Sequence, residues 1–335
     1  MEINRREFIE LGLFAIAGCA SSPLPPAPSP AQGQAGKAGR RSLYNGIEVG
    51  CITYSYRSMP CDAANVVRYA VESGLGTLEL KGEVVDGFVG KGGKRDMSKL
   101  PALKRFHGVD LVICNGENSA DGNGITPQSA QYLFDSGVDA LTLGNHTFRR
   151  REVYELLDEN PFIVRPANYP SKSTPGKGII NIDTGRRIVT LINLMGNLGV
   201  EDGLENAFEC ADRMLEQAES KIIIVDFHAE TTSEKRAMGY YLDGRVSAMF
   251  GTHTHVQTSD AQVLPKGTGY ITDAGMTGVI HSVLGVKTEI IINRLRTKLP
   301  ERFEQAAGEC SMEAVLFKVD DKSGKCVTAE SLRIE

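Results

Sequence analysis

The sequence lacks three features that would place it in common functional classes. It has no excess of positive charge, because its formal net charge is −5 over 335 residues, so nothing indicates a surface for a nucleic-acid polymer. Its seven cysteines form no Cys-x-x-Cys pair, which gives no sign of a disulfide framework or a structural zinc site. Its N-terminal apolar stretch, residues 11–17, is too short to span a membrane as a helix. The composition, with 41% hydrophobic and 24% charged residues, is that of a globular protein with one large core or two modest ones.

The N-terminal residues resemble an export signal. The run Arg5-Arg6-Glu7-Phe8 resembles a twin-arginine motif. The run Ile16-Ala17-Gly18-Cys19 resembles a bacterial lipobox, whose cleavage leaves the cysteine as the lipidated first residue. Glu10 departs from this pattern, and a frayed amphipathic start with a chance pair of arginines is the alternative interpretation. We expect residues 1–19 to be an export signal with a lipobox, and Cys19 to attach the protein to a membrane of the cell envelope.

Two further segments precede the main body of the chain. Residues 20–44 are rich in Ser, Pro, Ala and Gly and predict a disordered linker. Residues 45–90 predict a β-α-β unit, with strands at 47–55 and 77–80 around a helix at 62–73. This unit resembles the first unit of the xylose-isomerase-like sugar-phosphate isomerases, but a barrel of that kind needs eight units and the remaining chain does not supply them. We therefore interpret it as a fused fragment and not as a working isomerase.

A pair of histidines follows an apolar run late in the chain. Residues 246–250 predict a buried strand, and the run Gly251-Thr252-His253-Thr254-His255 comes directly after it. Side chains two apart on an extended chain project to the same side, so His253 and His255 could reach one metal ion. The alternative is a pair of structural histidines at the end of a strand.

Three other predicted strands end in the same way, which favours the metal site over the alternative. Polar side chains that can bind metal follow the strands at 109–114, 138–143 and 222–225; they are Glu117 with Asn118, Asn145 with His146, and His228. Oxygen and imidazole ligands mixed in this way suit Fe, Mn or Zn. A bridging carboxylate can hold two ions, and two-metal sites favour phosphoryl chemistry. His146 is also suited to act as a general acid near neutral pH.

These motifs, in this order, resemble those of the calcineurin-like metallophosphoesterases and most closely their YmdB-like branch, the bacterial cyclic-nucleotide phosphodiesterases. The resemblance covers about residues 90–335, and we expect residues 91–335 to form the metallophosphoesterase domain. It implies an α/β fold, a four-layer α-β-β-α sandwich, with a centre of two divalent or mixed-valence metal ions, Fe or Mn. It also implies hydrolysis of 2′,3′-cyclic nucleotides at the 2′ position by a metal-bound hydroxide.

The resemblance also implies a role for each matching residue. Glu117 would bridge the two ions. One ion would be held by Asn145, His228 and His253, and the other by Asn118 and His255. His146 would protonate the leaving oxygen.

The sequence departs from the family at its first metal ligand. The family opens on a strand that ends Gly-Asp-Val-Val-Gly, whose Asp completes the site of the second ion. Here the similar run Gly82-Glu83-Val84-Val85 has Glu in place of Asp and requires a four-residue insertion before Gly90. An alignment without a gap puts the Asp position at Gly87, beside Asp86. We prefer Glu83 as the ligand with Asp86 as its substitute, and the remaining alternative is that neither binds metal.

Two functions from different classes follow from this sequence. The first is a metal-dependent phosphodiesterase acting on a small phosphodiester substrate, with no nucleic-acid polymer as partner. The second is a degenerate, non-catalytic lipoprotein that binds one metal ion or a nucleotide. The leader predicts the cell envelope, with membrane attachment only through Cys19, whereas the cytoplasm is usual for the family. A homo-oligomer is compatible with either function.

Overall fold

The computed structural model describes residues 43–44, 47–48, 50–52, 77–79 and 100–334. The chain divides into two compact units, one formed by residues 1–60 and 64–79 and the other by residues 61–63 and 80–335. The expected export signal, with Cys19, and most of the expected linker lie outside the described residues. The expected helix at 62–73 also lies outside them.

The first unit contains four short described strands. Strand β1 (Leu43–Tyr44), at the end of the expected linker, pairs antiparallel with β2 (Ile47–Glu48). Strand β3 (Gly50–Ile52) pairs in parallel with β4 (Thr77–Glu79). A β-α-β unit has two parallel strands, as β3 and β4 are; the segment between them lies outside the described residues.

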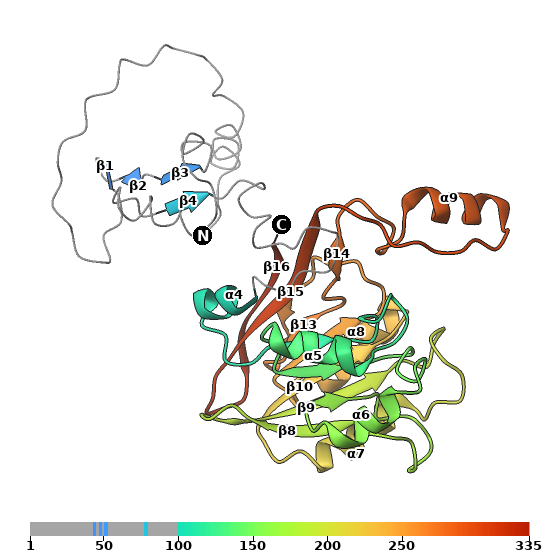
Figure 1. The fold of residues 1–335 in the computed structure, drawn as a ribbon. Helices are drawn as coiled ribbons and strands as arrows, with labels where there is room; N and C mark the ends of the chain where they lie inside the picture. The colour runs from blue at the N-terminus through green and yellow to red at the C-terminus, as the bar shows by residue number, and fades with distance from the viewer. Residues whose placement is uncertain (1–42, 45–46, 49, 53–76, 80–99, 335) are drawn as a thin grey trace, which may run out of the picture. The chain divides into compact units, whose positions relative to one another are not determined.

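The second unit is an α/β body in which helices and strands alternate (Figure 1). Its helices are α4 (Leu100–His107), α5 (Pro127–Asp135), α6 (Val153–Glu159), α7 (Ala207–Glu216), α8 (Thr232–Leu242) and α9 (Thr288–Thr297). Its strands are β5 (Ile113–Asn115), β6 (Ala140–Thr142), β7 (Ile163–Val164), β8 (Ile179–Asp183), β9 (Ile188–Met195), β10 (Ile222–His228), β11 (Ala248–Thr252), β12 (Gln262–Val263), β13 (Gly269–Ile271), β14 (Thr277–Val279), β15 (Cys310–Val319) and β16 (Cys326–Ile334). Among the described residues, none of these helices is both long and apolar enough to cross a membrane.

The largest sheet of this body has the strand order β12-β13-β11-β10-β9-β8. Its four inner strands run parallel, and the edge strands β8 and β12 run antiparallel to their neighbours. Register pairs His228 at the end of β10 with Thr252 at the end of β11. Because parallel strands carry their carboxyl ends to one edge of a sheet, residues that follow these strands gather there.

Strand β10 differs from its prediction in one respect. The apolar pattern placed its end at Val225, whereas the strand continues through Asp226 to His228 and is buried almost throughout. A buried carboxylate is tolerated only where donors satisfy it, and Asp226 accepts hydrogen bonds from Asn115, Thr142 and Thr252. Because these three partners lie far away in the sequence, no local pattern reveals them. They allow β10 to continue past Val225 to His228.

Two smaller sheets face the largest one. One is the parallel sheet β5-β6-β7 and the other is the antiparallel sheet β14-β15-β16. A core of buried apolar side chains between the sheets joins them; it includes Ala140, Val164, Leu191, Ile224, Phe250 and Ile271, with Val315 and Phe317 packed against it. The parallel strands β9, β10 and β11 are buried along almost their whole length, as expected for strands covered on both faces.

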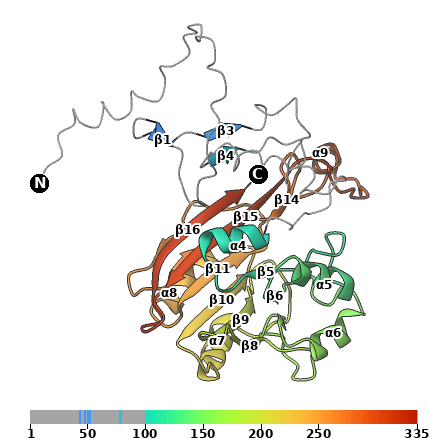
Figure 2. The ribbon, with the colours of Figure 1, turned by 60° about the vertical axis from the view of Figure 1, so that its left-hand side comes forward.

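Helices cover the outer faces of the sheets. Buried side chains of α7 and α8, including Cys210 and Met238, pack against β9, β10 and β11. Side chains of α4, α5 and α6 pack against β5, β6 and β7 around Leu141. In Figure 2, α5 and α6 lie on the side of β5 and β6, and α8 lies across β11 on the other side.

Local chemistry explains where these helices begin. The predicted start of α5 at Thr126 and Pro127 is confirmed: the Thr126 hydroxyl accepts a hydrogen bond from the amide of Ser129, and the Ser129 hydroxyl accepts one from the amide of Thr126. This reciprocal cap satisfies two of the donors that a helix start leaves free. Asn206 and Thr231 cap α7 and α8 with their side chains.

Candidate metal centre

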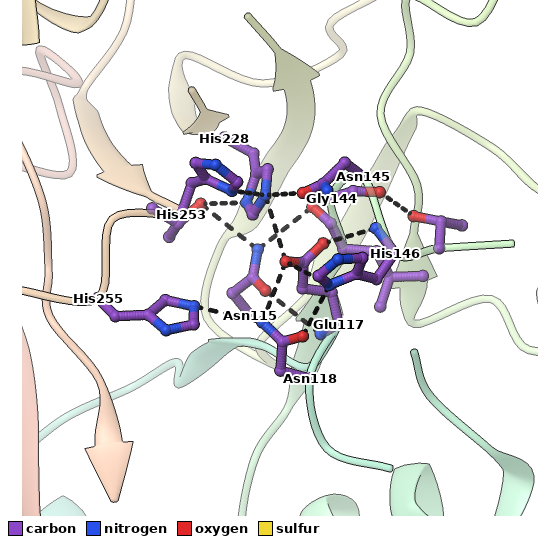
Figure 3. Close-up of polar contacts among 12 residues, drawn as sticks. Asn115, Glu117, Asn118, Gly144, Asn145, His146, His228, His253 and His255 are labelled. Carbon is purple, nitrogen blue, oxygen red and sulfur yellow. Dashed lines mark hydrogen bonds and ion pairs between the residues drawn. The ribbon is translucent and has the colours of Figure 1, made fainter. Parts of the chain in front are cut away.

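Seven residues that the sequence singles out lie together at the carboxyl ends of four strands (Figure 3). Glu117 and Asn118 follow β5, Asn145 and His146 follow β6, His228 ends β10, and His253 and His255 follow β11. The two remaining candidates, Glu83 and Asp86, lie outside the described residues.

The innermost group is Glu117, His228 and His253, whose ligand atoms all lie within 4.8 Å of one another. His228 Nε2 lies 3.3 Å from Glu117 Oε1 and 3.0 Å from His253 Nδ1. Asn145 Oδ1 lies 3.0 Å from the same His228 Nε2. Glu117 and His228 are each only 1% exposed. Four electron-pair donors therefore converge on one small buried volume.

This arrangement fits a metal ion. Without a cation between them, oxygen and imidazole lone pairs at such distances repel one another, so the convergence is unfavourable unless protons or an ion occupy it. Gly144 makes the room: an added Cβ at this residue would lie 2.3 Å from both Glu117 Oε2 and His228 Nε2. A mixed set of carboxylate, amide and imidazole ligands suits Fe, Mn or Zn.

The charge states of the group also suit a cation. Burial by itself raises the pKa of Glu117, but the charge and hydrogen bond of His228 and the amide of His146 lower it to a net value of about 2. Glu117 is therefore a carboxylate at neutral pH. Burial and the adjacent His228 lower the pKa of His253, which favours the neutral imidazole that metal binding requires.

Asn118 connects this group to the other two histidines. Its Nδ2 donates to Glu117 Oε1 at 3.1 Å and lies 3.2 Å from His255 Nε2. Its Oδ1 therefore faces His146 Nδ1, at 2.8 Å. A carbonyl oxygen can only accept, so His146 Nδ1 carries the proton and His146 Nε2 is the atom left for exchange with a substrate.

The His228 ring is held from behind by two residues that the sequence analysis did not select. His228 Nδ1 lies 2.9 Å from the Thr252 hydroxyl, which donates to Asp226 Oδ1 at 2.7 Å. Because the single hydroxyl proton goes to Asp226, Thr252 accepts from His228 Nδ1 and leaves Nε2 free for a metal. Burial raises the pKa of Asp226, and the charge of His228 and three hydroxyl and amide donors oppose that rise. Period-two alternation could have indicated Asp226, which lies two residues before His228 on one face of β10.

The His253 ring is held by Glu230, which is not among the candidate residues predicted from the sequence. Glu230 Oε2 lies 2.9 Å from His253 Nε2, so His253 presents Nδ1 to Glu117 and His228. A carboxylate behind a ligating imidazole fixes the tautomer and the direction of the ring. The only sequence signal for Glu230 is its place in the run that follows His228.

The backbone that carries the two late histidines is not extended, contrary to the argument from spacing. Strand β11 ends at Thr252, and the φ angles are +99° at His253 and +63° at His255. The physical reason is Asp273, which binds both the amide and the hydroxyl of Thr254 between them. Both rings still reach the site, but through a turn.

Comparison with known proteins finds a matching family and similar structures. A model of a family described as YmdB-like protein matches residues 84–332. A protein of Bacillus subtilis (strain 168) named 2′,3′-cyclic-nucleotide 2′-phosphodiesterase is 45% identical over 244 residues, which are 72% of this chain and 92% of the relative. A crystal structure of a novel phosphatase from Mycoplasma pneumoniae is similar with a TM-score of 0.68 at 33% identity, covering 72% of this chain and 89% of that one. A crystal structure of a hypothetical protein from Thermus thermophilus is similar with a TM-score of 0.65 at 42% identity, covering 70% of this chain and 92% of that one.

Proposed function

The chain belongs to the YmdB-like family, and on that premise we propose that it is a metal-dependent phosphodiesterase that hydrolyses 2′,3′-cyclic nucleotides. The observation that carries the proposal is the convergence of Glu117, His228 and His253 within 4.8 Å. The 45% identity to a relative named for this activity supports the choice of substrate. The proposal includes the finer architecture, a four-layer α-β-β-α sandwich around this centre.

The proposal includes ligands for two ions, of which all but one come from the described residues. Glu117 would be shared, with Asn145, His228 and His253 completing one site. Asn118 and His255 would contribute to the other, together with Glu83 or Asp86. Fe and Mn are the ions that we propose. When bound, such ions neutralise charge on the phosphoryl oxygens and activate water.

The chain's own contribution to proton transfer comes from His146. Its Nδ1 is committed to Asn118 Oδ1 at 2.8 Å, and its backbone amide donates to Glu117 Oε2 at 3.0 Å. These two bonds fix the ring beside the centre, with 29% of its side chain exposed. A proton held on Nε2 can therefore pass to the 2′ oxygen as it leaves phosphorus.

The test is hydrolysis of 2′,3′-cyclic AMP by the full chain loaded with Mn²⁺, beside a His146→Ala control. We expect turnover to a 3′-monophosphate that falls about 10²- to 10⁴-fold in the variant, while the variant keeps its bound Mn²⁺. A folded, Mn²⁺-loaded protein that gives no turnover contradicts the proposal. It favours instead the non-catalytic lipoprotein, which is expected to hold one ion or none where the enzyme holds about two.

We also propose where the protein acts. Its N-terminal residues support export and attachment through a lipidated Cys19 to the cell envelope, although the family is ordinarily cytosolic. Cell fractionation checks this: Cys19→Ala should move the protein out of the membrane fraction. A soluble pool of the unaltered chain that retains Met1 contradicts it. A homo-oligomer remains part of the proposal, to be measured by light scattering.

A further inference from the structure

The turn that carries His253 and His255 has an unusual backbone conformation, because both histidines have positive φ angles. Five residues other than glycine have positive φ among those described, and three of them, Asp121, Leu284 and Lys298, are exposed. The other two are His253 and His255, both at the candidate metal centre. Positive φ is uncommon for residues other than glycine, and two such residues close together in a half-buried turn need surroundings that hold them there.

A buried network enforces it at the residue between the two histidines. Asp273 Oδ2 accepts the Thr254 hydroxyl at 2.6 Å and the Thr254 amide at 3.2 Å. The same oxygen accepts Lys235 Nζ at 2.7 Å, and Lys235 Nζ also donates to the Thr254 hydroxyl oxygen at 3.2 Å. Three donors thus meet at one carboxylate oxygen, and two of them belong to Thr254.

The network is anchored in three separate parts of the body. Lys235 comes from α8, and its side chain and that of Asp273 are both 0% exposed. The other oxygen of Asp273 accepts the amide of Gly275 at 2.9 Å, which fixes the carboxylate relative to the segment after β13. Gly251 leaves the room for this close approach, because an added Cβ there would lie 1.8 Å from the backbone oxygen of Thr272.

A fully buried ion pair is a weak device for stability, because desolvation offsets most of its attraction. Neither Lys235 nor Asp273 is among the groups that meet at the metal centre. What the pair does achieve is conformational: it sets the position of Thr254 from both its backbone and its side chain. Because residue 254 lies between the two histidines, its position constrains the backbone from which both rings project.

We propose that Thr254, Asp273 and Lys235 are positioning residues that hold the strained turn so that His253 and His255 face one metal centre. This inference rests on the proposed function, since it assumes that the two histidines bind metal. Without the hydroxyl bond of Thr254, the turn can relax toward ordinary φ values, and the rings rotate away from Glu117 and Asn118.

The test compares Thr254→Val with Thr254→Ser in the full chain. Valine matches the shape of threonine but removes the hydroxyl, and serine keeps the hydroxyl. The readouts are Mn²⁺ affinity by titration calorimetry, the Mn²⁺ electron paramagnetic resonance spectrum, and the melting temperature in excess chelator. We expect Mn²⁺ to bind about 10- to 100-fold more weakly to the valine variant, with an altered spectrum. Serine should restore affinity to within about threefold. In excess chelator both variants should still unfold cooperatively, the valine variant at a lower temperature because buried Asp273 and Lys235 lose the hydroxyl.

A second variant tests whether Thr254 and Asp273 act as one network. In an Asp273→Asn background the network is already weakened, so Thr254→Val should add little to the loss of Mn²⁺ affinity, as expected for residues of one network. Wild-type Mn²⁺ affinity in Thr254→Val, or full additivity of the two changes, overturns the inference. Failure of the proposed function is distinguishable, because an unaltered chain that binds Mn²⁺ without hydrolysing 2′,3′-cyclic AMP leaves the positioning role testable by affinity alone.

Discussion

One added methyl group at Gly144 would test the candidate metal centre directly. The Cβ of alanine at this residue would lie 2.3 Å from Glu117 Oε2 and 2.3 Å from His228 Nε2. Contacts of that kind below 3.0 Å are essentially never observed, so each ligand atom must retreat by about 0.7 Å, several times the tolerance of about 0.2 Å in metal–ligand distances. Both side chains are buried, with 1% of each exposed, so neither can move aside into solvent.

The expected result of Gly144→Ala is a folded protein that has lost its metal. The φ angle of Gly144 is not positive, so alanine is compatible with the backbone, and overpacking should cost about 1–3 kcal/mol of folding free energy. Metal affinity should fall by at least about 100-fold, which is about 2.8 kcal/mol of binding free energy.

Calorimetric titration with Mn²⁺ measures the affinity, and thermal melts with and without chelator report the same loss. Metal at about 100 times its dissociation constant stabilises the unaltered chain by about 2.7 kcal/mol, and this difference should vanish in the variant. Gly278→Ala in β14 is the matched control, because its Cβ would meet only Met276, with Cε nearest at 3.4 Å. A Gly144→Ala protein that binds Mn²⁺ as tightly as the control would show that the ion is not held by Glu117 and His228.

Three other changes have definite expectations. Thr252→Val removes the acceptor behind His228 Nδ1, so Mn²⁺ affinity should fall about 10- to 100-fold and urea denaturation should show about 1–3 kcal/mol less stability; equal affinity contradicts the assigned tautomer. Glu230→Ala should weaken Mn²⁺ binding about tenfold, whereas Glu230→Gln should keep most of it because its amide oxygen still accepts from His253 Nε2; equal losses in both would count against that hydrogen bond. Burial raises the pKa of Cys210 to about 11 from 9.0, so the folded state holds this thiol proton more tightly and stability should fall between pH 9 and 11, by about 1.4 kcal/mol per pH unit for one proton. Cys210→Ala should flatten that part of the urea-denaturation profile, and an unchanged slope would rule out this thiol as the cause.

The strand framework could be predicted well because its apolar runs are local. The expected strands at 138–143 and 246–250 overlap β6 (Ala140–Thr142) and β11 (Ala248–Thr252). The expected strand at 109–114 overlaps the shorter β5 (Ile113–Asn115). A strand buried on both faces needs apolar residues at successive positions, and that requirement is visible in a single sequence.

Other elements carried no comparable signal. Strands β15 (Cys310–Val319) and β16 (Cys326–Ile334) pair with each other in an antiparallel ladder, yet most of their residues are only partly buried or exposed. Helix α9 (Thr288–Thr297) has no buried residue. Where burial is partial, the apolar periodicity that reveals an element is weak. None of these three elements is therefore predicted from the sequence.

The sequence by itself determined which chemistry this protein carries and where the strands deliver it. Carboxylate, amide and imidazole groups directly at or after the ends of apolar runs were enough to select Glu117, Asn145, His228 and the two late histidines. That choice depends only on local pattern and on the rule that parallel strands end at one edge.

Only the tertiary structure decided how those groups face one another. The bond between His228 and Asn145 joins residues 83 apart, and the bond between Asn118 and His255 joins residues 137 apart. The direction of each imidazole is set by a partner from another element: Thr252 for His228, and Glu230 for His253. The physical reason is that ring orientation, tautomer and backbone strain depend on distances between segments remote in sequence, and those distances exist only once the sheets have packed.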